Sequence, residues 1–230
     1  MKFNKFIRIL GQPSNRYATF KRLKEYHSQP RTLEDTVYWA MNFGGRGYYK
    51  VYTIQKPSEI LALAKAVQAI KPKVILEIGT ARGGTLFIWS QIASDEVISC
   101  DIDDLSIQSK ILKAFPPPNS MCRVSLLTGN SHDAEFKKRI VNRLGGRKVD
   151  FLFIDGDHTE AGVTADYNDY KDFVGPGGII AFHDIVKEQP LESNQVFHLW
   201  ERIKQGAETV EFVEDPKQCG FGIGIVRIQR

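Results

Sequence analysis

Two short stretches of the sequence carry ionisable side chains at a spacing that suits catalysis. Asp155, Asp157 and His158 follow one short apolar run, and His183 with Asp184 follows another. If both runs form neighbouring parallel strands, their carboxyl ends meet at one edge of the sheet, where ligands bind in such folds. Carboxylates and imidazoles gathered there could bind a metal ion or transfer a proton.

The carboxylates of Asp155 and Asp184 would repel each other at adjacent strand ends unless a cation or a proton lies between them. A hard, oxygen-preferring ion such as Mg²⁺ suits that position. His158 can accept a proton near neutral pH, because the pKa of an unperturbed imidazole is ~6.5. Simpler roles stay open, since Asp157 and His158 could each serve only to open the helix that follows the strand.

A glycine-rich stretch follows an earlier apolar run. Gly79, Gly83 and Gly84 allow a sharp turn and let a ligand approach the peptide groups closely. Their spacing is not the Gly-x-Gly-x-x-Gly of dinucleotide-binding loops, so a nucleoside without a pyrophosphate fits better. Asp101 ends the next apolar run, 22 residues after Gly79. An acidic residue at an offset of about 20 residues binds the ribose hydroxyls in dinucleotide-binding folds.

A sheet must position these residues, and five short apolar runs predict one. The runs are residues 74–79, 97–101, 124–128, 151–154 and 178–182. Each is bounded by Gly, Asp or Pro, and helix-length segments separate them. Apolar strands without alternation, placed between helices, are typical of a parallel sheet that is covered on both faces. We therefore expect a doubly wound α/β fold with right-handed crossovers.

Helical periodicity is present in several of the intervening segments. We expect helices over residues 57–72, 107–115 and 163–170, because apolar residues recur on one face and prolines or glycines follow. After a last helix, the apolar segments 210–213 and 221–228 are separated only by a loop. They are expected to form an antiparallel hairpin at an edge of the sheet.

The beginning of the chain differs from this alternation. Residues 1–55 are expected to form a helical cap, with one helix after Pro13 and a second that opens at Thr32 and closes at Gly44. Thr32 starts a capping pattern with an acidic residue three positions later. Residues 56–230 then make up the main domain.

The composition limits the class of protein. With 42% hydrophobic and 25% charged residues, the chain can bury a core, so wholesale disorder is excluded. No run approaches the ~20 apolar residues that a membrane span needs. The net charge of +4 arises in residues 1–32, where solvated helix faces explain it best and no nucleic-acid partner is expected. The three cysteines lack a CxxC spacing, which favours reduced thiols and a cytoplasmic protein.

Taken in order along the chain, these motifs resemble those of class I S-adenosylmethionine-dependent methyltransferases. Within that class the chain is most similar to the cephalosporin hydroxylase-like group and to macrolide-sugar O-methyltransferases such as macrocin O-methyltransferase. The resemblance covers roughly residues 55–228 and rests on Leu76-Glu77-Ile78-Gly79-Thr80, Gly83-Gly84-Thr85, Asp101, Gly129-Asn130-Ser131, Asp155-Gly156-Asp157-His158, Gly175-Pro176-Gly177-Gly178 and His183-Asp184. It implies a Rossmann-like sheet of seven strands in the order 3-2-1-4-5-7-6, with strand 7 antiparallel.

The resemblance also implies a binding site for S-adenosylmethionine. The glycine turn would hold the methionine part, Asp101 the ribose hydroxyls, and Asn130 with Ser131 the adenine, while Glu77 would lie just behind the cofactor. The implied cofactor-binding residues are Glu77, Gly79, Thr80, Gly83, Asp101, Asn130, Ser131 and Asp155.

In metal-dependent relatives, an acid at the position of Asp155 and a pair of residues at the end of strand 5 bind Mg²⁺. That pair is His183 and Asp184 here, and His158 stands at the position of the catalytic base, beside Asp155. Imidazole is a reluctant Mg²⁺ ligand. Three interpretations follow: His183 points to the substrate, the metal is a softer divalent ion, or no metal binds.

These observations favour an O-methyltransferase (EC 2.1.1.-) that uses S-adenosylmethionine, assisted by a divalent metal, on a hydroxyl of a small molecule or sugar. The acceptor itself cannot be identified from the sequence. Tyr48, Tyr49, Phe197 and Trp200 are candidates for its pocket, although the spacing of the last two also fits a helix that faces the core.

Two other functions stay open. The chain could be a catalytically silent subunit that only binds S-adenosylmethionine, but such a subunit would be expected to lose the acidic residues and His158. It could also be a non-haem iron hydroxylase, with His158, His183 and Asp184 as iron ligands, although the glycine turn and Asp101 would then be unexplained. The sequence does not specify the oligomeric state, and a homo-oligomer is compatible with all three functions.

Overall fold

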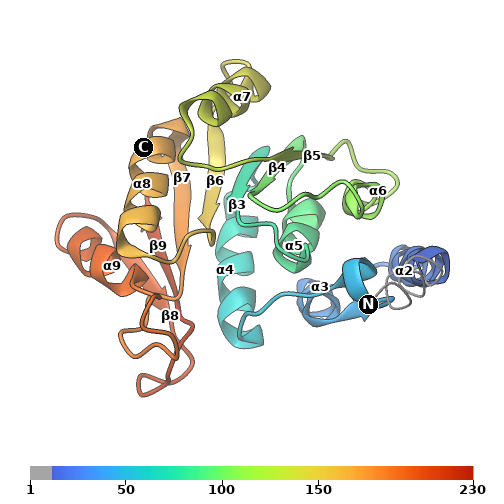
Figure 1. The fold of residues 1–230 in the computed structure, drawn as a ribbon, viewed down its shortest axis with the longest axis horizontal. Coiled ribbons are helices and arrows are strands. Elements are labelled where there is room, and N and C mark those ends of the chain that lie inside the picture. Colours follow the sequence, from blue (N-terminus) through green and yellow to red (C-terminus); the bar gives the residue numbers. More distant parts are fainter. Residues whose placement is uncertain (1–11, 230) are drawn as a thin grey trace, which may run out of the picture.

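A seven-stranded sheet runs through the centre of the molecule (Figure 1). The computed structural model describes residues 12–229. The strands are β3 (Val74–Ile78), β4 (Glu96–Asp101), β5 (Arg123–Thr128), β6 (Val149–Ile154), β7 (Val174–His183), β8 (Thr209–Phe212) and β9 (Ile223–Arg227). They lie in the order β5-β4-β3-β6-β7-β9-β8, and β9 runs in the direction opposite to that of the other six strands. This is the predicted order, so the predicted fold is confirmed.

The register of the sheet aligns the carboxyl ends of its central strands. Ile78 pairs with Ile154, which in turn pairs with Phe182. All three side chains are buried, as expected for strands that are covered on both faces. The residues at the common edge are Gly79, Asp155 and His183.

Strand β7 begins earlier than predicted. The segment Gly175-Pro176-Gly177, interpreted as a break before the strand, lies within β7. Val174 pairs with Val149 and Ile179 with Phe151, so the pairing of β6 with β7 is irregular between these positions. Because proline cannot donate to the ladder, a bulge is where a strand can accommodate it.

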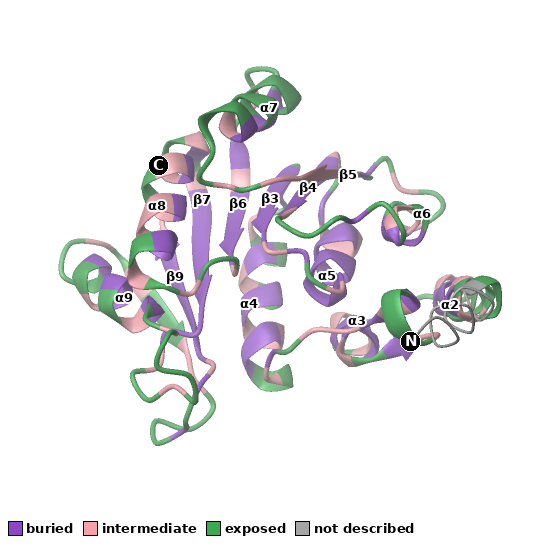
Figure 2. Cartoon of the chain, in the orientation of Figure 1, coloured by how far each residue is buried: buried purple, intermediate pink, exposed green. Residues whose placement is uncertain are grey.

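Helices cover both faces of the sheet (Figure 2). They are α4 (Pro57–Ala69), α5 (Gly84–Ile92), α6 (Ser109–Leu112), α7 (Ala134–Leu144), α8 (Glu160–Tyr170) and α9 (Val196–Lys204), with a 3₁₀ turn η2 (Lys171–Phe173). Side chains of α4, α5 and α6 belong to one buried cluster, which extends into the N-terminal helices. Side chains of α7, α8 and α9 belong to a second cluster on the opposite face. None of the helices within residues 12–229 combines the length and apolarity that a membrane crossing requires.

Two helices differ from the sequence-based expectation. The helix predicted over residues 107–115 is only the four-residue α6, and Ile107 is exposed outside it. Helix α7 was not predicted individually, although Phe136, Ile140 and Leu144 form one buried stripe at a spacing of four residues. That spacing is typical of an amphipathic helix and was available in the sequence.

The N-terminal region forms a small layer against α4 and α5. It consists of α2 (Gln12–His27), α3 (Leu33–Met41), the strands β1 (Phe43–Gly44) and β2 (Lys50–Val51) and the turn η1 (Gly47–Tyr49). Thr32 caps α3 through the predicted capping box with Asp35. Helix α3 ends at Met41, before the predicted Gly44, which instead pairs with Lys50. The first eleven residues of the predicted cap lie outside the described residues.

Aromatic packing joins this N-terminal layer to α5. The ring of Tyr26 in α2 meets Phe87 of α5 edge to face, with 4.8 Å between the ring centroids. The same ring contacts Trp39 of α3 at 5.4 Å. Edge-to-face pairs at these distances stabilise beyond the area they bury. The layer is therefore fixed to the helix that begins at the glycine turn.

Candidate active site

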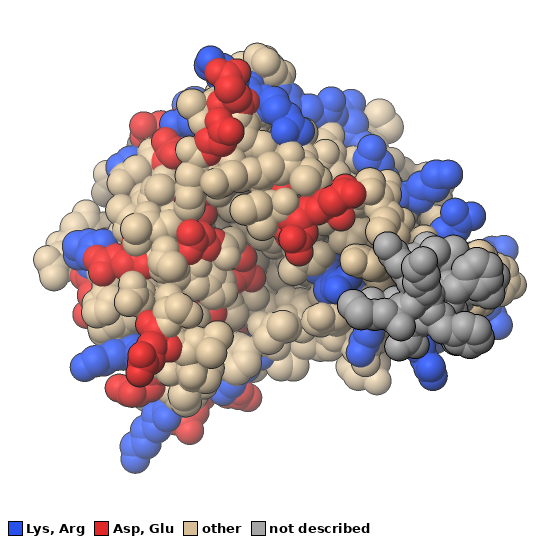
Figure 3. All heavy atoms as spheres, viewed as in Figure 1, with Lys and Arg blue, Asp and Glu red and all other residues tan. Residues whose placement is uncertain are grey.

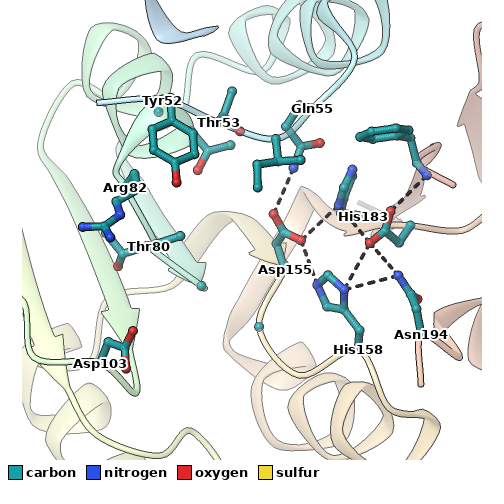
Figure 4. Close-up of a pocket in the computed structure, with 18 of the residues that line it drawn as sticks. Tyr52, Thr53, Gln55, Thr80, Arg82, Asp103, Asp155, His158, His183 and Asn194 are labelled. Carbon is teal, nitrogen blue, oxygen red and sulfur yellow. Dashed lines mark hydrogen bonds and ion pairs between the residues drawn. The ribbon is translucent and has the colours of Figure 1, made fainter. Parts of the chain in front are cut away.

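A cavity of about 630 Å³ opens at the carboxyl ends of the central strands. Its lining comes from the glycine turn, the segment between the N-terminal layer and α4, the residues after β6 and β7, and residues of the loops 189–194 and 220–221. Four side chains, Asp155, His158, His183 and Asp184, form what we call the ionisable cluster. Figure 4 shows this cluster at one end of the cavity and Thr80, Arg82 and Asp103 at the other. Part of each set that the sequence singled out thus borders one space: Gly79, Thr80 and Gly84 from the glycine turn, and Asp155, His158, His183 and Asp184 from the cluster.

Asp155 is the centre of the ionisable cluster. Its Oδ1 atom lies 3.2 Å from Nε2 of His158 and 3.1 Å from Nδ1 of His183. Its Oδ2 atom accepts a hydrogen bond of 2.9 Å from the side-chain amide of Gln55. The carboxylate after β6 is therefore held from three directions, because these partners come from its own turn, from β7 and from the segment before α4.

Asp184 completes the cluster from the end of β7. Its Oδ2 atom lies 3.1 Å from Nδ1 of His158 and accepts a hydrogen bond of 2.7 Å from Asn194. Its Oδ1 atom accepts the backbone N–H of Phe221 at 3.0 Å. His158 is consequently held between two carboxylates. The structure brings Asp155, His158, His183 and Asp184 together, as the sequence predicts.

The protonation of the cluster follows from these contacts. Burial raises the pKa of Asp155, but the charge of His183 and hydrogen bonds from both imidazoles outweigh it and lower the pKa to about 2. Burial lowers the pKa of His158, but its bonds to Asp155 and Asp184 outweigh that effect and raise the pKa to about 10. The pKa of His183 is also raised, chiefly by Asp155 acting against burial. A positive charge between the two carboxylates is thus present on the imidazole of His158 at neutral pH.

Asp157 stands apart from the cluster. It lies outside the cavity lining, and its Oδ1 atom accepts the backbone N–H of Thr159 at 2.9 Å. Thr159 is the N-cap of α8, because its side chain accepts the N–H of Gly162. Asp157 therefore supports the turn that leads to the helix, close to the capping role considered for it.

Several buried polar atoms around the cluster have no hydrogen-bond partner among the described residues. They are Oε1 of Gln55, Nε2 of His183 and Oδ1 of Asn194. Buried polar atoms normally find partners, so such a group points to a polar ligand or water at the site. Gln55 and Asn194 were not predicted, because they lie in connecting segments without a recognisable motif.

One potential metal-ligand group occurs within residues 12–229. Asp155, His158 and His183 each offer one ligand atom, and these atoms lie within 4.8 Å of one another. The set implied by the sequence was Asp155, His183 and Asp184. The group with suitable distances contains His158 in place of Asp184. Asp184 lies next to it, on the Nδ1 side of the His158 imidazole.

The glycine turn approaches the cluster closely. Gly79 has φ +101°, and a β-carbon there would lie 2.0 Å from the carbonyl oxygen of Asp155. Only glycine fits this position. Thr80 lines the cavity, and its hydroxyl lies 2.6 Å from that of Ser99. Gly83 has φ +76° and is the N-cap of α5, just outside the cavity lining.

Glu77 lies behind the glycine turn and is fully buried. Its Oε2 atom accepts a short hydrogen bond from the hydroxyl of Ser99, while Oε1 has no partner among the described residues. Burial raises the pKa of Glu77 to about 7, against the opposing effect of the Ser99 hydrogen bond. Glu77 thus lies outside the cavity lining, and its place behind a bound cofactor stays a prediction.

Asp101 holds the backbone of its own region. Its two carboxylate oxygens accept the N–H of Ala81 at 2.6 Å and the N–H of Asp103 at 2.8 Å. Asp101 does not line the cavity, whereas Asp103 and Asp104 do. Figure 3 shows acidic side chains along the rim of the hollow on this face. An acidic pair two residues after Asp101 was the signal in the sequence for these further candidates.

Asn130 and Ser131 follow β5 and do not line the cavity. The carboxamide of Asn130 accepts the N–H of His132 at 2.9 Å. The carbonyl of Ser131 accepts the hydroxyl of Tyr170 at 2.6 Å. The loop begins beside Asp101, because the N–H of Gly129 donates to the carbonyl of Asp101 at 2.8 Å.

The aromatic candidates for an acceptor pocket divide into two groups. Tyr48 lines the cavity, where Arg82 lies over its ring at 5.1 Å. Tyr49 is buried and outside the lining. Phe197 is also outside it, and Trp200 packs into the core below β9. The core interpretation of the helical spacing is therefore correct for Trp200, whereas Phe197 is half-buried and belongs to neither buried cluster. The aromatic residues that line the cavity without having been singled out in the sequence are Tyr52 and Phe221.

The order and direction of the seven strands are those of class I S-adenosylmethionine-dependent methyltransferases. The profile of the family described as Rhamnosyl O-methyltransferase/CmcI matches residues 42–218, which is most of the chain. The chain belongs to this family of O-methyltransferases. No curated protein sequence matches it.

Solved structures of O-methyltransferases share the fold. An O-methyltransferase from Bacillus cereus in complex with SAH has a TM-score of 0.58 and 18% identity, with 90% of this chain and 96% of that chain covered. TomG from Streptomyces achromogenes, involved in tomaymycin synthesis and bound to SAM, has a TM-score of 0.54 and 16% identity, with 74% and 78% covered. MycE from the mycinamycin biosynthetic pathway, in complex with Mg and SAH, has a TM-score of 0.52 and 20% identity, with 73% and 49% covered.

Proposed function

We propose that this chain transfers a methyl group from S-adenosylmethionine to a hydroxyl of a small molecule or sugar, assisted by a divalent metal ion. The observation that supports this best is that one cavity borders both the glycine turn and the ionisable cluster. A cofactor on the turn and an acceptor at the cluster would therefore be neighbours. Methyl transfer is an in-line displacement, which requires that proximity and alignment.

On the cofactor side, we assign the methionine part to the glycine turn and the ribose to the end of β4. Asp101 is the proposed ribose ligand, and the cavity-lining position of Asp103 makes it a second candidate. The loop after β5 is the proposed adenine contact, because it begins beside Asp101. The proposed residues are Glu77, Gly79, Thr80, Gly83, Asp101, Asn130, Ser131 and Asp155.

On the acceptor side, His158 is the proposed base and Asp155 the residue that orients it. The side chain of His158 is about one third exposed and lines the cavity. To accept a proton from a hydroxyl, the imidazole must first lose the proton that Asp155 and Asp184 stabilise. Activity therefore requires that another positive charge near Asp155 and Asp184 lower the pKa of His158 when the substrates are bound.

The donor set of the cluster fits a divalent cation. We propose that Asp155, Asp184 and His183 hold it, and MycE is a solved relative in fold that contains Mg. A set that includes imidazole suits Mn²⁺, Fe²⁺, Co²⁺ or Zn²⁺ better than Mg²⁺. When bound, the cation would supply Lewis acidity for an ionised acceptor oxygen and offset the carboxylate charge that keeps His158 protonated.

Calorimetry and a transfer assay test this function. S-adenosylhomocysteine should bind to the purified protein, and NAD⁺ should not. Tritiated methyl groups from S-adenosylmethionine should appear on members of a panel of hydroxyl compounds, such as catechol and methyl α-L-rhamnopyranoside. EDTA should abolish the transfer without preventing cofactor binding, and Mn²⁺ or Mg²⁺ should restore it. Binding of NAD⁺ in place of S-adenosylhomocysteine would contradict the assignment.

One observation favours a second candidate function. Asp155, His158 and His183 form a group of two imidazoles and one carboxylate, which is the ligand set of non-haem iron oxygenases. This hypothesis leaves the glycine turn without a role. Oxygen consumption in the presence of Fe²⁺ and 2-oxoglutarate, without methyl transfer, would favour it. Cofactor binding without either reaction would favour a silent subunit.

A further inference from the structure

The loop between β8 and β9 contains three successive residues in the left-handed region of backbone conformation. Gly220 has φ +80°, Phe221 has φ +63° and Gly222 has φ +84°. Glycine adopts this region without cost, but a residue with a bulky side chain is strained there. Such strain persists only where the surrounding structure enforces it, and it often marks a functional site.

The end of β7 holds this turn from one side. The N–H of Phe221 donates to Oδ1 of Asp184, and Asp184 itself has φ +62°. The N–H of Val186 donates to the carbonyl of Phe221 at 3.2 Å, and the N–H of Gly220 donates to the carbonyl of Glu188 at 2.6 Å. The strained Phe221 is thus joined directly to a residue of the ionisable cluster.

Glu59 of α4 holds the turn from the other side. Its side chain is 2% exposed. Its Oε2 atom accepts the N–H of Gly222 at 2.9 Å, and Oε1 accepts the N–H of Glu214 at 3.0 Å and the amide of Gln218 at 2.8 Å. A buried carboxylate that accepts three hydrogen bonds from one loop fixes the conformation of that loop.

The turn places the ring of Phe221 in the wall of the cavity rather than in the core. Its centroid lies 6.0 Å from that of His183, with the planes at 60°. Ile54 and Leu191 also line the cavity, with exposed fractions of 69% and 66%. Exposed apolar side chains that border one hollow are typical of a ligand-binding surface.

We propose that Phe221 determines acceptor specificity by packing its ring on the apolar face of an acceptor ring, and that Glu59 is the residue that positions Phe221. The proposal rests on the proposed methyltransferase function. An aromatic ring and a pyranose both present such a face next to their hydroxyls, so the shared feature is a six-membered ring with a hydroxyl. A phenylalanine that served only the core would not need a strained backbone to reach it.

Saturation-transfer NMR on the full chain with S-adenosylhomocysteine tests the role of Phe221. The probes are catechol, methyl α-L-rhamnopyranoside and, as an open-chain control, 1,2-propanediol. The natural protein should saturate at least one ring probe and not the open-chain diol. Phe221→Gly should weaken the binding of that ring probe at least tenfold, and Phe221→Leu should weaken it less, because it keeps apolar bulk but not the planar face.

Lys71→Gly is the matched control for the backbone. Lys71 has φ +51°, is exposed and follows α4 away from the cavity. This variant should leave probe binding unchanged, and both glycine variants should bind S-adenosylhomocysteine as the natural protein does. Equal saturation of ring and open-chain probes, no ring binding by the natural protein, or undiminished binding by Phe221→Gly would each overturn the proposal. Failure of the natural protein to bind S-adenosylhomocysteine would instead contradict the proposed function.

A double-mutant comparison tests the positioning role of Glu59. Glu59→Gln should weaken ring-probe binding in the natural background and have no further effect in the Phe221→Gly background. Glu96→Gln is the control, because Glu96 is equally buried but pairs with Arg143 and Arg147. That control should leave probe binding unchanged. If Glu59→Gln weakens probe binding equally in both backgrounds, Glu59 does not act through Phe221.

Discussion

Nδ1 of His158 lies 3.1 Å from Oδ2 of Asp184, so one imidazole bridges the turn after β6 and the end of β7. On its other side, Nε2 of the same ring faces Asp155. Both contacts stabilise the imidazolium, and together they outweigh the effect of burial on the pKa. The imidazole of His158, the proposed base, is therefore protonated and donates hydrogen bonds. It can act as a base only after a cation or a substrate group binds one of the two carboxylates in its place.

Asp184→Asn should lower the pKa of His158 from about 10, because it removes one of the two charges that stabilise the imidazolium. Histidine NMR titrations of the two proteins measure this directly. The raised pKa of His158 also stabilises the folded state. This contribution to the free energy of unfolding is fully present below the unfolded pKa of ~6.5 and is lost as the pH rises through the folded pKa of about 10. The melting temperature of the natural protein should therefore fall more steeply between pH 7 and 10 than that of the variant. An unchanged titration midpoint would show that Asp184 does not stabilise the charge.

Glu77 should make the protein less stable as the pH rises. Its pKa is about 7 in the folded state against an ordinary 4.5, so the folded state binds the proton more tightly across that window. Stability from this group is present below the unfolded pKa and is lost as the pH rises through about 7, by roughly 3 kcal/mol. Glu77→Gln should remove this part of the pH dependence in chemical denaturation. A slope that is the same in both proteins would contradict it.

The sequence was sufficient to predict the sheet and the meeting of its strand ends. Apolar runs without alternation specify buried parallel strands, and once those strands are parallel, the residues after them must meet. The meeting of Asp155 and His183 at one edge of the sheet therefore follows from the sequence alone. The hairpin at the C-terminal edge was predictable for a different reason, because only a loop separates its two strands.

The partners of these residues were not predictable. Gln55 and Asn194 reach the cluster from connecting segments, where no periodicity specifies which side chain turns inward. Phe221 reaches the cavity only because its backbone adopts a left-handed conformation that phenylalanine rarely takes. The short α6 shows the same limit, since Ile107 has the spacing of a helical residue but lies outside the helix.

Asp101→Ala should weaken the binding of S-adenosylhomocysteine about ten- to a hundredfold, equivalent to ~1.5–3 kcal/mol of charge-assisted hydrogen bonds. The residue also holds the N–H groups of Ala81 and Asp103, so its loss disturbs both sides of the proposed ribose site. Calorimetry on Asp101→Ala and Asp103→Ala separates the candidates. If only Asp103→Ala weakens binding, the ribose contact belongs to the cavity-lining acid.

Gly84→Ala should detach the segment that joins the N-terminal layer to α4. A β-carbon on Gly84 would lie 2.4 Å from the backbone nitrogen of Thr53, and the N–H of Gly84 donates to the carbonyl of Tyr52 at 3.1 Å. Overpacking of this kind costs about 1–3 kcal/mol. The melting temperature should fall by several degrees, and limited proteolysis near residue 53 should accelerate. Gly206→Ala is the control, because a β-carbon there meets no atom within 4 Å.

His183→Glu should change the metal preference of the site from transition ions toward Mg²⁺. His183 is 4% exposed and its Nδ1 atom lies 3.1 Å from Oδ1 of Asp155 and 3.5 Å from Oδ2 of Asp184. Replacing this imidazole by a carboxylate would leave three acidic groups together, which repel one another without a cation and suit a hard ion when one is bound.

Calorimetric titration of Mn²⁺ and Mg²⁺ into both proteins measures that preference. The natural protein should bind Mn²⁺ at least tenfold more tightly than Mg²⁺, because an imidazole in the set favours the transition ion. In His183→Glu the ratio should fall, and Mg²⁺ should raise its melting temperature more than it raises that of the natural protein. If neither ion binds the natural protein while methyl transfer proceeds fully in EDTA, the cluster acts without metal. The proton on His158 would then remain the cation that joins the two aspartates.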